Sequence, residues 1–200
     1  MLKNQIPSKA REAAEDVFFG QIAIIVARWF LIGAGILIAI WSATDILQLS
    51  LAIVTLIVLM GMNFFAHARY MTGRPINQIM LLFMSLVDVT AITLMIFFWN
   101  GKTGLDSDFF VLYYPMLIAW ALVFGPGVTT IFSLMTLAIY ATVCLLGTDP
   151  QLMFSITGFE TLAARVITLA AMSGLGTYYY RRQRDSLRTL VAKPIPSFFK

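Results

Sequence analysis

Residues 109–146 contain no charged side chain, and this stretch constrains the fold more than any other part of the chain. Gly125-Pro126-Gly127 divides it into apolar segments of 16 and 19 residues. A helix rises about 1.5 Å per residue and the hydrocarbon core of a bilayer is about 30 Å thick, so the second segment spans it and the first spans it only with its ends in the interface. Neither helix continues easily through Gly-Pro-Gly. The pattern predicts a tight hairpin of two membrane helices.

The composition agrees with a membrane protein that has little mass outside the bilayer. The 200 residues are 60% hydrophobic and 12% charged, against about 25% charged residues in a soluble domain. The mean hydropathy is +0.84. The single cysteine, Cys144, excludes an internal disulfide and is typical of an apolar helix core.

Hydrophobic segments predict an all-α, polytopic membrane protein with six transmembrane helices. The polar, mixed-charge residues 1–23 predict a cytoplasmic N-terminus with an amphipathic helix that lies at the interface and bends into the membrane, and Ser8 is a candidate cap. Residues 24–180 form the six-helix domain, and residues 181–200 form a basic cytoplasmic tail. The expected spans are residues 24–41, 46–66, 78–99, 109–124, 128–146 and 154–180.

Basic residues indicate the orientation. If both termini lie on one side, that side holds twelve of the fourteen Lys and Arg residues, with Arg28 counted there as a side chain that reaches the inner headgroups. Lys102 lies on the opposite side and Arg165 lies inside the membrane. The asymmetry predicts a multi-pass protein of the cytoplasmic membrane with both termini in the cytoplasm.

Three ionisable residues fall within predicted spans, namely Asp88, Glu160 and Arg165. Such groups are costly in a bilayer unless they are paired or hydrated, so each is a candidate ligand-binding or structural site. Counted from the cytoplasmic side, Asp88 and Arg165 lie at depths of about 18 and 22 Å. The favoured interpretation is a structural Asp88–Arg165 pair, and the alternatives are a ligand or ion site and a proton path. Glu160 is a poor partner for Arg165 because it lies about 140° around the same helix.

Other chemistry has little support in the sequence. The only histidine, His67, lies at the edge of a span, which disfavours haem ligation and favours an interfacial polar residue. Phosphate-loop, HExxH, CxxC and GxSxG motifs are absent, so we expect neither an enzyme nor a metal site, and the sequence assigns no cofactor. The aromatic entry to the fourth span predicts a pocket that the Asp88–Arg165 pair would also shape, with an aromatic lining of Phe109, Phe110, Tyr113 and Tyr114.

Several segments resemble the N-terminal six-helix membrane region of certain bacterial sensor histidine kinases, such as those of Chloroflexus-like bacteria. The segments are ARWFLIGAGILIAIW, NFFAHARY with GRPINQ, LVDVTAITLMIFFWNG, DFFVLYYPMLIAWALVFGPG and ARVITLAAMSGLGTYYYRRQRDSLR, and the resemblance covers about residues 22–190. It implies a membrane sensing or docking module. In those kinases the last span leads into a signalling helix, a phosphoacceptor histidine and an ATP-binding domain. Here Lys193-Pro194-Ile195-Pro196 is expected to stop the helix, and the sole histidine is His67, so kinase activity is not expected.

Three functions therefore remain open. The first is a non-catalytic sensory or docking module that acts through a partner protein. The second is a structural accessory subunit of a larger respiratory or photosynthetic membrane complex, where the apolar spans bind subunits, lipid, quinone or pigment. The third, a small transporter, is the least favoured because no internal repeat is evident. The expected partners are the lipid bilayer and other membrane or cytoplasmic protein subunits, and not nucleic acid.

Overall fold

The chain folds into helices throughout the part that the structure describes. The computed structural model describes residues 8–74, 76–99 and 103–191, and within these ranges it contains no strand. The elements are α1 (Ser8–Ser42), α2 (Ile46–Met71), α3 (Gln78–Phe98), the 3₁₀ helices η1 (Gly104–Asp106) and η2 (Asp108–Leu112), α4 (Tyr113–Val123), α5 (Pro126–Gly147), the short α6 (Pro150–Met153) and α7 (Ile156–Val191). The predicted all-α class is confirmed.

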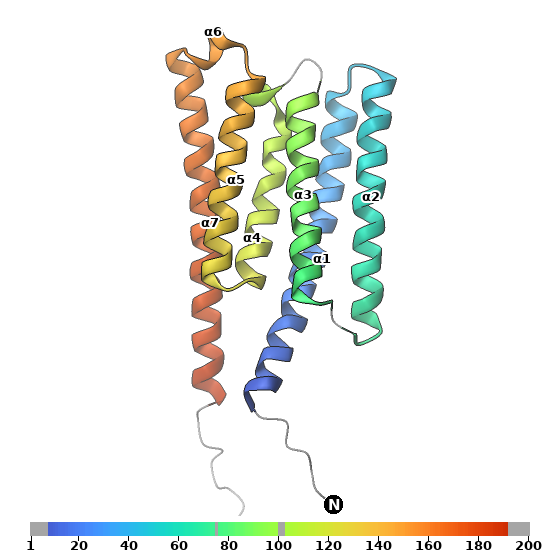
Figure 1. The fold of residues 1–200 in the computed structure, drawn as a ribbon, viewed down its shortest axis with the longest axis vertical. Helices are drawn as coiled ribbons and strands as arrows, with labels where there is room; N and C mark the ends of the chain where they lie inside the picture. Colours follow the sequence, from blue (N-terminus) through green and yellow to red (C-terminus); the bar gives the residue numbers. More distant parts are fainter. Residues whose placement is uncertain (1–7, 75, 100–102, 192–200) are drawn as a thin grey trace, which may run out of the picture.

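The long helices stand side by side and run alternately up and down (Figure 1). The start of α1 and the end of α7 lie at the same end of the bundle, which we call the terminal end. The opposite end, which carries the 42–46, 98–108 and 147–156 connections, is called the distal end. This alternation follows from short connections, because a turn of a few residues can join only antiparallel neighbours.

The short helix α4 is the centre of the bundle. It packs against α1 and α7 and also contacts α3 and α5. Its buried side chains include Tyr113, Met116, Leu117 and Trp120. The preceding η2 rises about 2.0 Å per residue instead of about 1.5 Å, so the sixteen residues from Asp108 to Val123 cover about 27 Å. The hairpin break is where the sequence predicts it, since α4 ends at Val123 and α5 begins at Pro126.

In the part of the chain that the structure describes, four helices are long and apolar enough to cross a membrane: Gln21–Ser42 within α1, then α2, α3 and α5. Asp108–Val123 is apolar but shorter, and α7 carries Glu160 and Arg165 in its first half. The class is therefore an all-helical protein with apolar, membrane-type helices. Six crossings and an interfacial N-terminal helix remain predictions. Ser8, the candidate cap, is the first residue of α1, which runs as one helix to Ser42.

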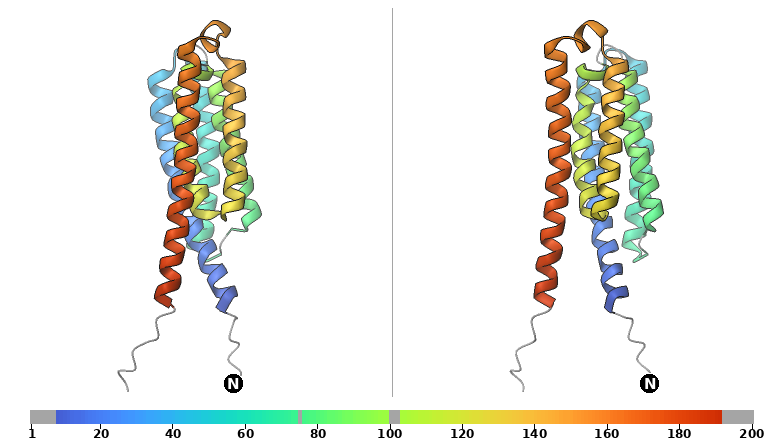
Figure 2. Two further views of the ribbon diagram at one scale, coloured as in Figure 1. Left: turned by 90° about the vertical axis from the view of Figure 1, so that its left-hand side faces the viewer. Right: turned by 60° about the vertical axis from the view of Figure 1, so that its left-hand side comes forward.

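Two helices are longer than the spans that they contain. α1 has 35 residues and α7 has 36, and both extend past the α4–α5 turn at the terminal end (Figure 2). Gly176 of α7 lies against Ala121 near the end of α4, so the part of α7 that follows leaves the bundle. The predicted stop at Lys193-Pro194 and the first seven residues lie outside the described part of the chain.

Candidate functional site: a buried ion pair and a second arginine

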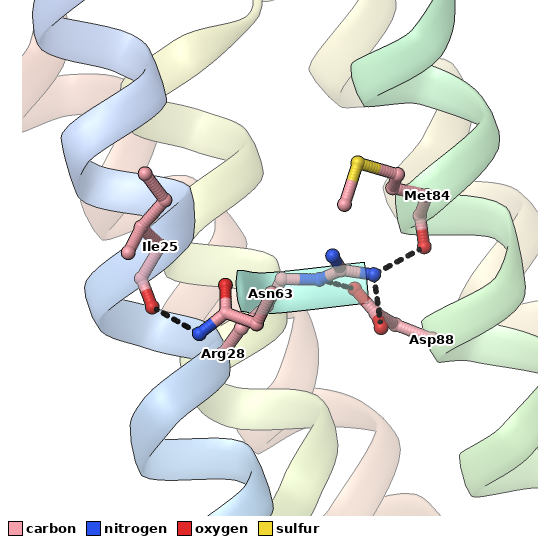
Figure 3. Close-up of polar contacts among 5 residues, drawn as sticks. All are labelled: Ile25, Arg28, Asn63, Met84 and Asp88. Carbon is pink, nitrogen blue, oxygen red and sulfur yellow. Dashed lines mark hydrogen bonds and ion pairs between the residues drawn. The ribbon is translucent and has the colours of Figure 1, made fainter. Parts of the chain in front are cut away.

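A buried ion pair joins α1 to α3 (Figure 3). Arg28 Nε lies 2.7 Å from Asp88 Oδ2, and Arg28 Nη2 lies 2.7 Å from Asp88 Oδ1. Nη2 also donates to the backbone carbonyl of Met84 at 3.0 Å. Each of the two charged residues is only 3% exposed. The fork of the guanidinium matches the carboxylate, and this two-bond geometry is the form in which a buried ion pair is most favourable.

Two amides add polar links beside the ion pair. Gln21 of α1 donates to the Ala66 carbonyl of α2 at 3.0 Å and accepts from the Ile76 N–H at 2.9 Å. Asn63 of α2 donates to the Ile25 carbonyl of α1 at 3.2 Å, as Figure 3 shows. Both amides are fully buried. The terminal half of α1 is thus held to α2 and to the 72–77 turn by side-chain hydrogen bonds as well as by packing.

The ion pair borders a cavity of about 10 Å³. Ser85 and Asp88 of α3, together with Met116 and Trp120 of α4, are among the lining residues, and Arg28 completes the polar part. A cavity of this size holds about one water molecule. Arg28 Nη1 is buried and makes no hydrogen bond within the described part of the chain. The cavity beside Asp88 therefore has room for about one water molecule next to the ion pair, and it is too small for an organic ligand.

The predicted Asp88–Arg165 pair is wrong. Asp88 is paired with Arg28, and α4 and α5 lie between α3 and α7 (Figure 1). The placement of Arg28 at the inner headgroups is wrong for the same reason. Similar depths of Asp88 and Arg165 do not predict that the two side chains meet, because side chains on a helix point toward its N-terminus. α3 begins at the terminal end and α7 at the distal end, so Asp88 and Arg165 point in opposite directions along the bundle.

Arg165 is held at the distal end by contacts with two other elements. Its Nη1 donates to the Ser107 carbonyl at 3.3 Å and to the Tyr140 hydroxyl of α5 at 3.2 Å. Its guanidinium carbon lies 3.8 Å from the centre of the Phe110 ring, which is a cation–π distance. Arg165 is half-buried. It therefore fastens α7 to α5 and to the η1–η2 segment without using a carboxylate.

The four aromatic residues at the start of the fourth helix pack on their neighbours. Phe109 and Tyr113 are buried, and the Tyr113 hydroxyl lies 2.8 Å from Thr93 Oγ1 of α3. Phe110 and Tyr114 are half-buried, with ring centres 5.9 Å apart. None of the four lines the cavity beside Asp88, which takes its α4 residues from further along the helix. Their expected role with Asp88 in a single pocket is thus not what the structure shows.

Glu160 is exposed on the first half of α7 and belongs to neither cluster. His67 is exposed near the end of α2, and Cys144 is buried in α5. Within residues 8–74, 76–99 and 103–191, no three His, Cys, Asp or Glu side chains gather as metal ligands.

The residues that the sequence interpretation missed are Arg28 as a buried partner, Gln21 and Asn63. A signal for two of them was present. Gln21 and Arg28 are seven positions apart and so lie on the same face of a helix. Two polar residues on one face of an otherwise apolar helix indicate polar partners on the neighbouring helices. Asn63 carries no comparable signal, since it is a single amide in an apolar segment.

Comparison with protein-family models, with curated proteins and with solved structures finds no match for this chain. The fold and the two arginine sites define it as an all-helical protein whose apolar helices are of the kind that cross membranes. The resemblance to the membrane region of sensor histidine kinases stays a prediction.

Proposed function

We propose that this chain is a non-catalytic membrane module, sensory or docking, that acts through a partner protein at its terminal end. The observation that carries the proposal is α7, a single helix of 36 residues that begins at the distal end, passes the central helix α4 and continues beyond it. One rigid element thereby joins the Arg165 site to the basic segment that starts at Arg181. This is the arrangement that a helix needs if it is to transmit a change across the bilayer.

The proposal includes six crossings, with both termini in the cytoplasm. The reach of about 27 Å of η2 and α4 supports a fourth crossing, and α7 packs against α4. Arg182 on the extension of α7, together with Arg69 and Arg74, falls at the terminal end, in agreement with the positive-inside rule. Residues 1–23 remain our candidate for an interfacial helix.

The two sides of the bundle are fastened differently, which supports a sensory role. α1, α2 and α3 are tied by an ion pair and by buried amides. α7 is held to α5 by the hydroxyl contact between Ser133 and Ser173, at 2.5 Å, and by Arg165. α7 also packs closely on α4, but this contact is largely apolar and includes small residues, and such a contact can shift by small steps more readily than the bidentate ion pair between α1 and α3.

An accessory subunit of a larger membrane complex is the second candidate. The observation in its favour is the exposed apolar face of α2, where Ile46 and Leu47 are 86% and 71% exposed and Leu51, Val54 and Ile57 continue the face. α2 packs mainly on α1, so most of its surface is open to lipid or to a neighbouring subunit.

Photo-cross-linking in native membranes tests the proposal. A benzophenone side chain at position 182, on the helical extension, is compared with one at position 154, which is 84% exposed at the distal end. We expect position 182 to give a cross-link to one defined soluble or signalling protein, and position 154 to give lipid adducts. Cross-links from both positions to redox or pigment-bearing subunits would favour the accessory subunit. Lipid adducts alone at both positions would contradict a partner at the terminal end.

A further inference from the structure

The guanidinium of Arg165 has unused hydrogen-bond donors on its outer side. Nη1 makes both hydrogen bonds of this side chain, to Ser107 and Tyr140. Nε and Nη2 donate to no residue in the described part of the chain, and neither is among its buried unpartnered atoms. Nε and Nη2 are therefore open to the surface of the bundle, and the Phe110 ring covers one face of the guanidinium.

The charge of Arg165 is also uncompensated within the described residues. Asp88, the ionisable residue that the sequence predicts as the partner of Arg165, is neutralised by Arg28. Glu160 lies about 140° away around α7, and the contacts of Arg165 within the described residues are with Ser107, Tyr140 and Phe110, none of them an acid. A cation at the edge of a bilayer that has no protein counter-ion attracts an anion from its surroundings.

The position of the guanidinium along the bundle indicates which kind of anion it can reach. The Arg165 side chain points toward the N-terminus of α7, hence toward the distal end. Its acceptor, Ser107, lies in the η1–η2 segment between Asp106 and Asp108, where the chain turns outside the apolar helices. This level corresponds to the headgroup region of the distal leaflet, where the phosphates of lipids lie.

We propose that Arg165 binds the phosphate of a phospholipid in the distal leaflet. Nε and Nη2 form the two-donor edge that a guanidinium presents to phosphate oxygens, while Phe110 and Tyr140 fix its plane. Toward the terminal end, Met172 lies half-buried at the edge of the face of α7 that carries Arg165, and Leu175, one turn further and about 80° around the helix from Arg165, is 53% exposed, so the two offer apolar surface along which an acyl chain can lie. This apolar continuation favours a lipid over free phosphate. The inference rests on the proposed crossing of the bilayer by α7.

Native mass spectrometry of the full-length protein, stripped of lipid in detergent, tests the site. The protein is titrated with phosphatidylglycerol and with diacylglycerol of the same acyl chains, which lacks the phosphate. We expect phosphatidylglycerol to bind wild type at least about tenfold more tightly than diacylglycerol, and Arg165→Gln to remove about that factor, since hydrogen bonds to charged groups have this strength. Glu160→Gln, on the same helix, should leave the affinity unchanged within about twofold.

Several results would overturn the inference. They are equal binding of the two lipids, an unchanged affinity in Arg165→Gln, and displacement of the bound lipid by millimolar inorganic phosphate, which would assign the site to a free anion. If Arg165→Gln does not fold, Arg165→Lys decides, because it keeps the charge and loses the two-donor edge. A lower phosphatidylglycerol affinity in Arg165→Lys supports the site, and an unchanged affinity rejects it. Cross-linking from position 182 reports on the partner independently.

Discussion

Arg28 and Asp88 fix the first helix against the third at one point along their length. Helices α1 and α3 make few other direct contacts, because α2 and α4 flank them. Both hydrogen bonds of this bidentate pair are 2.7 Å long, so α1 can slide little along α3 without breaking them. The pair therefore fixes the position of α1 along the bundle axis. Polar pairs inside a membrane protein commonly have this role of fixing register.

A double-mutant cycle tests this pair. Asp88→Asn alone and Arg28→Gln alone should each lower the free energy of unfolding by about 3–5 kcal/mol, since each leaves a buried charge without its partner. The double variant should recover much of the loss. Reversible unfolding in mixed detergent, followed by circular dichroism, measures all three values.

The matched control is Asp88→Asn combined with Arg165→Gln. Arg165 shares no contact with Asp88, so the two losses should add within about 0.5 kcal/mol. Additive losses for Asp88 with Arg28 would show that the pair contributes no coupling energy.

At the scale of elements, the contact between α4 and α7 depends on small residues. A Cβ atom placed on Gly176 would lie 2.6 Å from Ala121 Cβ, which is closer than such atoms approach. The glycine is therefore what lets the two helices touch at this level. Gly174, two residues earlier, has nothing within 4 Å of the equivalent position.

This contrast gives a paired prediction. Gly176→Ala should lower the free energy of unfolding by about 1–3 kcal/mol because it forces α7 away from α4, while Gly174→Ala should leave it unchanged or raise it by up to about 1 kcal/mol, because alanine favours the helix and meets no neighbour there. Combining Gly176→Ala with Ala121→Gly should restore most of the loss. A thermal unfolding series in one detergent is sufficient, and equal effects of the two alanine substitutions would reject the close contact.

The elements were largely predictable from the sequence, and their neighbours were not. Hydrophobic length and Gly-Pro-Gly locate α3 and α5 to within a few residues. The predicted Asp88–Arg165 pair is wrong because residue counts along a helix give only the depth of a residue. They do not give which helices are adjacent or which way a side chain points. Arg28 is an example. Its place near the start of an apolar span predicts a contact with the headgroups, but the side chain is paired with Asp88 and the residue is only 3% exposed.

The whole molecule places its charged sites toward opposite ends. The amide and ion-pair contacts of α1 to α3 lie in the terminal half, and the Arg165 cluster lies at the distal end around η2 and α5. The central helix α4 contacts both regions through Met116 and Trp120 on one side and Tyr113 on the other. The ion pair and the amides thus lie toward the terminal end of the bundle, and the Arg165 cluster lies at the distal end.

Cysteine labelling tests this orientation. In a Cys144→Ser background, Thr72→Cys lies in the exposed turn at the terminal end and Asp149→Cys in the exposed turn at the distal end. A membrane-impermeant maleimide should label position 149 in intact cells and position 72 only after permeabilisation, because the basic residues face the cytoplasm. The reverse pattern would invert the topology, and labelling of both positions from outside would exclude the odd number of crossings that the proposal places between them, through α3, η2–α4 and α5.

The long separation between the partners of the ion pair has a consequence for biosynthesis. Asp88 follows Arg28 by 60 residues, so α1 and α2 are synthesised before the carboxylate exists. In the topology that we propose, the guanidinium has the headgroups of the terminal side within reach until α3 inserts, because its side chain already points toward them. The arrival of Asp88 then exchanges lipid phosphate and water for a fixed counter-ion. Insertion of the third helix is thereby the step that commits the first helix to its final depth.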